Sequence, residues 1–330
     1  MSYGRVNKPR FYVDTINWLA SRGWSKEDEI TLKTGALNTG YTKYQLFDLN
    51  PLNVCSFNSN GESTAIIIEI DTNSTSNVPM DFIAIMNHNL YDAGAFVYLQ
   101  HDTATIDAFD VDEAIELDAV IGCGEYGATK AIDFDSGDTD SIATLDSDAT
   151  DRYRAIVIYF PEGGFTADIT IGSIIIGSHY TLPNSGELSV KRAIPFDGVT
   201  VRSTEGGKRY GHASWVAGND GNQYAPFKNQ PTASDYFRRQ GGRQAYDINF
   251  NYLADTDVFP SDMSWLGTST DFFTMVYNKT AGPMLPFIWT SDSTSTTEGD
   301  YLFARMTSDF QPTQIAHQAM SMSIRIEEEL

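Results

Sequence analysis

The segment from residue 153 to residue 177 constrains the fold of this chain more than any other part of the sequence. Two runs rich in Ile, Val and Tyr flank a turn at residues 161–164, whose sequence is Pro-Glu-Gly-Gly. Apolar runs on either side of a Pro/Gly turn are typical of a β-hairpin. In the second run, polar and apolar residues alternate from Asp168 to Ile171, which predicts a strand with one buried face and one solvated face. Such strands form antiparallel sandwiches, and we therefore expect a mainly β fold.

The same pattern of short apolar runs and polar turns recurs along most of the chain. We expect strands near residues 64–70, 82–86, 95–99, 244–252, 286–290, 301–306 and 320–327. In two of these strands the alternation is regular enough to assign the faces. Tyr246, Ile248, Phe250 and Tyr252 should share one face, and Met320, Met322, Ile324 and Ile326 should be buried while Ser321, Ser323 and Arg325 are more exposed.

Helices are expected to be few and short. The segment 14–21 predicts one helix, because Asp14 or Thr15 can cap its start and Gly23 can end it. A second helix is expected over residues 264–278, where aromatic and aliphatic side chains form a partial apolar stripe.

A break rich in Pro, Asn, Ser and Gly at residues 182–186 separates two strand-rich halves. We place the domain boundary there, which gives one domain over residues 1–182 and a second β-rich domain over residues 183–330. Both are predicted to be antiparallel β-sandwiches. Residues 1–12 read as an extended N-terminal arm, because Pro9 interrupts regular structure. The arm docks either on a neighbouring subunit or on its own domain.

The charge balance excludes one class of partner. The 330 residues include 22 Lys and Arg against 44 Asp and Glu, which gives a net charge of −22. Binding to a nucleic-acid backbone needs basic patches, so nucleic acid is not an expected partner. The sequence starts without the apolar segment of a secretory signal, and no apolar run approaches the ~20 residues of a membrane span. Cys55 and Cys123 lie in unrelated contexts and are expected to be buried free thiols, which leaves the redox compartment open.

The densest cluster of carboxylates is a candidate cation site. Asp133, Asp135, Asp138 and Asp140 surround Gly137. Ca²⁺ prefers about six to eight oxygen ligands, which carboxylates around a Gly can supply. The spacing differs from that of an EF-hand, because no Glu stands at the last position of the loop. The alternative is an acidic, solvated loop, and no other cofactor is expected.

A second candidate site is a polar triplet at the end of an apolar strand. Asn87, His88 and Asn89 directly follow the run 82–86. Polar side chains in this position can line a pocket for a polar ligand such as a sugar. Alternatively, the triplet is a turn in which Asn adopts a positive φ and His packs against its neighbours. A sugar-binding role requires an exposed aromatic platform beside the triplet.

No catalytic motif stands out in the sequence. It contains no GxSxG motif, P-loop, dinucleotide-binding fingerprint, CxxC or HExxH. We therefore expect a protein without enzymatic activity, although two carboxylates that act as acid and base need no sequence motif. Arg238, Arg239 and Arg243 form a small basic island, which either meets an acidic patch on a neighbouring subunit or belongs to a solvated loop.

Several segments resemble structural proteins of tailed bacteriophages. In the first half these are Phe-Ile-Ala-Ile-Met-Asn-His-Asn-Leu within residues 82–100 and the pair of runs at 153–177, which ends in Ile-Gly-x-x-x-x-Gly. In the second half they are Gly-Arg-Gln-Ala-Tyr-Asp-Ile at 242–248, Leu-Pro-Phe-Ile-Trp at 285–289 and Ile-Arg-Ile-Glu-Glu at 324–328. In such proteins the first two segments belong to a jelly-roll domain similar to galactose-binding modules. The resemblance therefore implies this fold for residues 1–182.

The resemblance also implies a role without catalysis in a virion, as a component of the tail or baseplate that assembles in many copies. Its partners would be other copies of itself and other virion proteins, and the protein would be made in the host cytoplasm. A carbohydrate-binding receptor module, whose partner is a host surface glycan, and a capsid decoration protein are the alternatives. The family brings no catalytic residues to carry over to this sequence.

Overall fold

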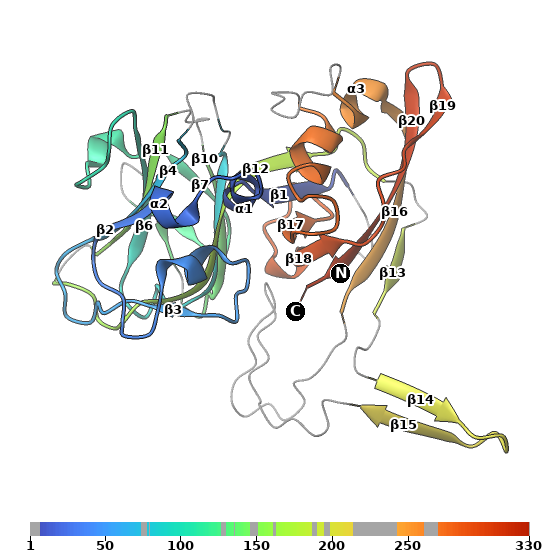
Figure 1. Ribbon diagram of the computed structural model, residues 1–330, viewed down its shortest axis with the longest axis horizontal. Helices are drawn as coiled ribbons and strands as arrows, with labels where there is room; N and C mark the ends of the chain where they lie inside the picture. Colours follow the sequence, from blue (N-terminus) through green and yellow to red (C-terminus); the bar gives the residue numbers. More distant parts are fainter. Residues whose placement is uncertain are drawn as a thin grey trace.

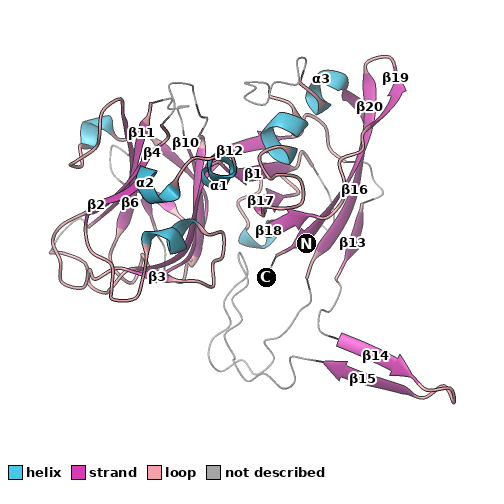
Figure 2. Cartoon of the chain, in the orientation of Figure 1, coloured by secondary structure: helices cyan, strands magenta, loops and turns pink. Residues whose placement is uncertain are grey.

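The architecture comes from a computed structural model of the chain (Figure 1). It describes residues 7–73, 78, 80–126, 130–134, 136–145, 151–160, 163–186, 190–194, 199–213, 243–260 and 270–329. Strands dominate these residues, and helices are few and short (Figure 2). Neighbouring strands in both large sheets run antiparallel. The predicted mainly β, antiparallel fold class is confirmed.

The N-terminal half contains a jelly-roll-like β-sandwich of two facing sheets. The smaller sheet has six strands in the order β2 (Ile30–Thr34), β4 (Ile66–Asp71), β11 (Tyr153–Tyr159), β6 (Phe96–Asp102), β9 (Ala131–Asp133) and β8 (Gly124–Tyr126). It faces part of a larger sheet, formed by β12 (Thr170–Thr181), β5 (Phe82–His88), β10 (Asp140–Leu145), β7 (Leu117–Ile121) and β3 (Cys55–Ser56). The core between the sheets is rich in Ile, including Ile68, Ile85 and Ile156. Burial of these alternating side chains from both sheets holds the sandwich together.

The larger sheet continues from β12 into the C-terminal half. Strand β1 (Arg10–Asp14) pairs with β12 on one edge and with β17 (Phe287–Thr290) on the other. Beyond β17 the order is β18 (Tyr301–Met306), β20 (Ala319–Glu328), β16 (Ala245–Ala254) and β13 (Lys191–Ala193), and β19 (Thr313–Ala316) pairs with β20. One sheet of 12 strands therefore runs through both lobes seen in Figure 1.

The predicted domain boundary at residues 182–186 falls between β12 and β13. Each half has a hydrophobic cluster of its own. A third cluster joins the halves, because Phe82 of β5 and Ile288 of β17 belong to the same buried group. The division into domains at 1–182 and 183–330 stays a prediction. In the structure the two halves share one sheet.

The N-terminal arm is part of this shared sheet over the residues that are described. Phe11 and Tyr12 are fully buried, and the backbone of β1 is paired on both edges. The carbonyl oxygen of Lys8 accepts a hydrogen bond from the backbone N–H of Ser293 at 2.9 Å. Residues 7–12 therefore dock on their own chain, while residues 1–6 lie outside the described residues and their docking on a neighbouring subunit stays a prediction. Apolar side chains on both faces of β1 require cover on both faces, which the two halves supply.

The helices are short connections between strands. They are α1 (Ile16–Ser21), α2 (Lys26–Glu29), α3 (Asp255–Val258), the 3₁₀ helices η1 (Lys43–Phe47), η2 (Val111–Glu113) and η5 (Glu298–Asp300), and the π-helix η4 (Phe273–Tyr277). Helix η4 packs against the large sheet through Phe272 and Val276. Helix α1 matches its prediction: the Asp14 carboxylate accepts a hydrogen bond from the Asn17 N–H at 2.6 Å, and Gly23 follows with a φ of +96°. The sequence also predicts a helix over residues 264–278. Residues 264–269 lie outside the described residues, and η4 forms within residues 270–278. Among the described helices, none has the length and apolar character needed to cross a membrane.

Two predictions about strands are wrong. Residues 153–177 do not form a hairpin, because β11 lies in the six-stranded sheet and β12 in the larger sheet opposite. The alternation predicted from Asp168 to Ile171 is confirmed, because both Ile side chains are buried and both polar ones are partly exposed. Further along β12 both faces are buried, since one face lines the sandwich and the other faces the C-terminal half. In β16, Tyr252 is 75% exposed, because a bulge after Phe250 places Leu253 opposite Met320.

Most other assignments of strand faces are confirmed. In β20, Met322, Ile324 and Ile326 are buried while Ser323 and Arg325 are exposed. Met320 and Ser321 are both partly buried, so the predicted difference between them is not seen. Both cysteines are free thiols, Cys55 buried and Cys123 half-buried. Burial raises the pKa of Cys55 to about 11 and that of Cys123 to about 12, so both stay protonated at neutral pH.

Candidate functional site

The polar triplet closes the end of β5 through internal hydrogen bonds. Asn87 has a φ of +53°, a conformation that Asn tolerates better than most residues. Its backbone N–H donates to the Asp140 carboxylate at 3.1 Å, and its side-chain amide donates to the Pro51 carbonyl at 2.8 Å. The side chain therefore ties β5 to the loop before β3 and does not point freely into solvent.

His88 is buried at the same junction. Its Nε2 lies 3.0 Å from the hydroxyl of Ser141, and its Nδ1 accepts a hydrogen bond from the Leu90 N–H at 3.4 Å. The ring also packs edge-on against Phe134, with centroids 4.8 Å apart. Burial lowers the pKa of His88 to about 3, so the imidazole is neutral at physiological pH.

Asn89 connects the triplet to the start of β12. Its side-chain amide donates to the Asp168 carbonyl at 2.9 Å, and its side-chain oxygen accepts from the Thr170 N–H at 2.7 Å. The arrangement has the features of the turn alternative, with a positive φ at Asn87 and a packed His88. Binding of a ligand by the triplet stays a prediction. One exposed aromatic residue, Tyr91, does lie beside it and is 47% exposed.

The carboxylates of the predicted Ca²⁺ site are only partly described. Asp133 ends β9, Asp138 precedes β10, and Asp140 is fully buried at the start of β10, while Asp135 lies outside the described residues. Within the described part of the chain, no group of three or more carboxylate, His or Cys side chains is arranged to hold a metal ion. The Asp140 carboxylate instead accepts the hydrogen bond from Asn87. A cation site that includes Asp135 stays a prediction.

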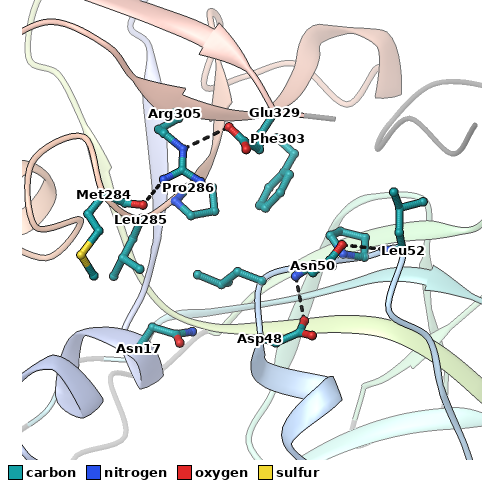
Figure 3. A pocket seen from close by; sticks show the side chains of 12 residues that line it. Asn17, Asp48, Asn50, Leu52, Met284, Leu285, Pro286, Phe303, Arg305 and Glu329 are labelled. Carbon is teal, nitrogen blue, oxygen red and sulfur yellow. Dashed lines mark hydrogen bonds and ion pairs between the residues drawn. The ribbon is translucent and has the colours of Figure 1, made fainter. Parts of the chain in front are cut away.

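A cleft lies where the two halves meet, and Figure 3 shows the side chains that line it. Its volume is about 380 Å³. The N-terminal half contributes Asn17 and residues 48–52, and the C-terminal half contributes residues 284–286, Phe303, Arg305 and Glu329. No local sequence pattern predicts this cleft, because its walls come from segments more than 200 residues apart.

Most polar groups in the cleft are bonded to one another. Arg305 forms an ion pair with Glu329 at 3.0 Å and donates to the carbonyl of Met284. On the opposite wall, the Asp48 carboxylate accepts from the Asn50 N–H at 2.8 Å. Nearby, Lys26 donates to the Asn17 side chain at 2.5 Å, and burial lowers its pKa. Each of these bonds lies within one half, so they fix the two walls of the cleft separately and occupy polar groups at its edge.

A second hollow lies on the N-terminal half and is lined mainly by acids. Its volume is about 320 Å³, and its lining residues are His101, Asp102, Thr103, Asp112, Glu113 and Asp151. His101 contacts the Asp151 carboxylate through its Nδ1. The backbone N–H of Ala104 lowers the pKa of Asp102, which keeps that carboxylate charged. The hollow suits a cationic group.

The most unusual surface is a hairpin that projects from the C-terminal half. Strands β14 (Val199–Ser203) and β15 (Arg209–Ala213) form a two-stranded sheet of their own, away from the body of the molecule in Figure 1. We call residues 199–213 the projecting hairpin. Every side chain described in residues 200–210 is exposed, including Val201 at 60% and Tyr210 at 54%. No motif in the sequence marks this segment as a surface for partners. Of the basic island at 238–243, only Arg243 lies within the described residues.

Comparison with known proteins finds only remote similarities. No protein-family model matches the sequence, and no curated protein matches it. Among solved structures, the CBM32-1 module from a family 31 glycoside hydrolase of Clostridium perfringens is 11% identical, with a TM-score of 0.32 over 46% of this chain and 95% of that module. The lectin domain of lectinolysin, complexed with Lewis B antigen, is 13% identical, with a TM-score of 0.31 over 50% of this chain and 99% of the domain. A structure of reduced XRCC1 bound to the DNA polymerase β catalytic domain is 14% identical, with a TM-score of 0.30 over 46% of this chain and 98% of the matched chain. At these TM-scores the similarities assign no function to this chain.

Proposed function

We propose that this chain is a structural subunit without enzymatic activity that assembles in many copies, as a tail or baseplate component of a tailed-phage virion. The observation that carries the proposal is the projecting hairpin. A two-stranded hairpin is marginally stable alone in water and needs packing against other structure. In the described residues this hairpin pairs only with itself and exposes apolar side chains on its strands. A subunit of an assembly supplies the missing cover from another chain.

The triplet and the cleft support the same reading. Asn87, His88 and Asn89 use their hydrogen-bonding groups inside the fold, and polar groups of the cleft are paired within each of its walls. Both features stabilise the chain. The residues left for partners are on the outer surface, where contacts in an assembly are made.

Labelling of particles tests the proposed function. An antibody raised against the full chain should label the tail or baseplate of phage particles that carry its gene, as seen by electron microscopy. Labelling of the capsid would favour the capsid decoration alternative. Particles without label would overturn the proposal.

A variant that lacks the projecting hairpin tests the observation behind the proposal. Replacing residues 199–213 by a short Gly-Ser linker should leave the melting temperature unchanged, because these residues lie outside the hydrophobic clusters. The variant should enter particles poorly. Normal incorporation of a folded variant would show that the hairpin has no role in assembly.

A carbohydrate-binding module is the second candidate function. Tyr91 favours it, because this exposed ring lies two residues after Asn89 and supplies the aromatic surface that a sugar site beside the triplet requires. A glycan array with the full chain tests this candidate, and binding that depends on Tyr91 would support it.

A further inference from the structure

We propose that the projecting hairpin binds the acidic surface around η2 on a second copy of this chain. This inference rests on the proposed function, because it names the partner surface for the same hairpin. The acidic surface comprises Asp102, Asp110, Asp112, Glu113 and Glu116, with the exposed side chain of Val111 among them. The neighbouring Asp107 already forms an ion pair with Lys33 at 3.0 Å. The two surfaces match in charge and in the apolar residue that each exposes.

One face of the projecting hairpin carries two cations and an aromatic ring. Arg202 and Tyr210 are directly paired across the strands, so their side chains lie on the same face. The ammonium group of Lys208 lies over the ring of Tyr210, at 5.1 Å from its centroid. All three side chains are exposed. Arg209 pairs with Ser203 and lies on the opposite face.

This basic face is exceptional in an acidic protein. Residues 191–213 contain five Lys and Arg but only two Asp and Glu, while the whole chain has a net charge of −22. A basic segment on an acidic chain is attracted to other copies of that chain, and complementary charge sets orientation and association rate. The chain therefore carries both partners of the interaction.

The acidic surface is the best-matched target in the described residues. From Asp102 to Asp118 the sequence contains seven acidic and no basic residues. Val111 is 43% exposed at the start of η2, which gives Tyr210 an apolar neighbour. Beside η2 lies the acidic hollow, where the carboxylates of Asp102 and Asp112 can receive an Arg or Lys side chain.

The positions of the two surfaces determine the symmetry of the contact. In Figure 1 the hairpin extends from the lobe at the right, and η2, the green helix, lies at the far left. A hairpin on one copy therefore meets η2 of another copy and not its own. Such head-to-tail contacts use two different surfaces and build rings or filaments.

Charge reversal tests the hairpin side of the contact. The full chain should associate in sedimentation velocity experiments, and added salt should weaken the association. The double change Arg202→Glu with Lys208→Glu should weaken it by about tenfold or more. Arg202→Glu alone should also weaken it, and Arg209→Glu is the matched control for this single change, because it reverses one charge on the opposite face; its effect should be less than about threefold. Equal melting temperatures would show that all variants are folded.

Mixing experiments test the acidic side and the head-to-tail geometry. Asp112→Lys with Glu116→Lys should weaken association as strongly as the hairpin variant. A mixture of two neutralised variants, Arg202→Gln with Lys208→Gln and Asp112→Asn with Glu116→Gln, should stop at dimers, because each pair keeps one intact hairpin and one intact acidic surface and the two neutralised surfaces do not attract each other. A chain that carries all four charge reversals should associate again, since the charges are exchanged.

The outcomes separate this inference from the proposed function. If the full chain assembles but none of these changes weakens it, the inference is wrong while a structural subunit remains supported. If the full chain stays monomeric at high concentration, the inference is also wrong, and the labelling of particles decides the proposed function by itself. If the hairpin variant associates weakly but the acidic-surface variant associates as strongly as the wild type, the hairpin binds a different surface. This result overturns the inference.

Discussion

Strand β1 and the projecting hairpin are two short β-segments with opposite environments. Strand β1 is paired on both edges and buried on both faces, and it joins the two halves of the molecule. The projecting hairpin is paired only within itself and exposed on both faces. The side chains explain the difference, because β1 alternates Phe11 and Val13 with the equally buried Tyr12, whereas the hairpin carries Arg202 and Arg209 on opposite faces. The chain thus holds its halves together with one segment and offers the other to partners.

Truncation of a β1 side chain should give the largest effect on stability. Phe11 is fully buried and contacts Phe272 and Phe287 with ring centroids 5.5 Å away in each case. We expect Phe11→Ala to lower the free energy of unfolding by about 3–5 kcal/mol, because it leaves a cavity in the hydrophobic cluster of the C-terminal half. Val201→Ala in the projecting hairpin is the control and should change it by about 0.5 kcal/mol or less. Chemical denaturation measures both, and similar values for the two variants would contradict the comparison.

Sequence patterns identify the buried face of β20 and the start of α1, but they do not identify the strands with which β1 pairs. Period-two alternation at Ile324 and Ile326 and the capping carboxylate of Asp14 are local signals, and both are confirmed. The pairing of β1 with β12 and β17 joins residues more than 160 positions apart, so no local signal specifies it. The same holds for the hairpin predicted at 153–177, since its turn residues suit a tight turn as well as a crossing between sheets.

The candidate sites were predictable to a similar extent. The positive φ of Asn87 and the packing of His88 follow from the residue types at a strand end. The link from Asn87 to Asp140 could not be predicted, because it depends on β5 and β10 lying side by side. The acidic hollow and the cleft likewise bring together distant segments, and only the excess of carboxylates between residues 102 and 118 is visible in the sequence.

The pH dependence of stability tests the buried triplet. The pKa of His88 is lowered to about 3 from the 6.5 of an exposed imidazole, so the unfolded chain binds more protons between these pH values. The contribution of neutral His88 to stability is complete above pH 6.5 and is lost as the pH falls toward 3, by up to about 4 kcal/mol.

A His88→Asn variant isolates this contribution, because the Asn side chain can still accept from the Leu90 N–H but does not titrate. The difference in unfolding free energy between wild type and variant should shrink as the pH falls. A difference that is constant with pH would show that His88 is not buried in its neutral form.

Two glycines allow a matched test of the backbone around β1. A Cβ atom at Gly177 in β12 would lie 2.0 Å from the carbonyl oxygen of Val13, whereas one at Gly211 in the hairpin would meet nothing within 4 Å. We expect Gly177→Ala to cost about 1–3 kcal/mol, because β1 and β12 must move apart. Gly211→Ala should be neutral within about 0.5 kcal/mol. Thermal melts compare the variants, and a stable Gly177→Ala protein would mean that β1 is less tightly held than the structure indicates.

The smallest effect on stability is expected at Tyr91, which makes this residue a clean probe of the second candidate function. Its ring is about half exposed, so Tyr91→Ala should change the free energy of unfolding by less than about 0.5 kcal/mol. If the triplet and this ring form a sugar site, the substitution removes the aromatic surface and should weaken glycan binding by about fivefold or more. Tyr252→Ala is the control, because Tyr252 is still more exposed and lies on β16 in the other half. If Tyr91→Ala and Tyr252→Ala both still bind glycan, or if the wild type binds none, there is no sugar site at Tyr91. The projecting hairpin would then remain as the surface proposed for function.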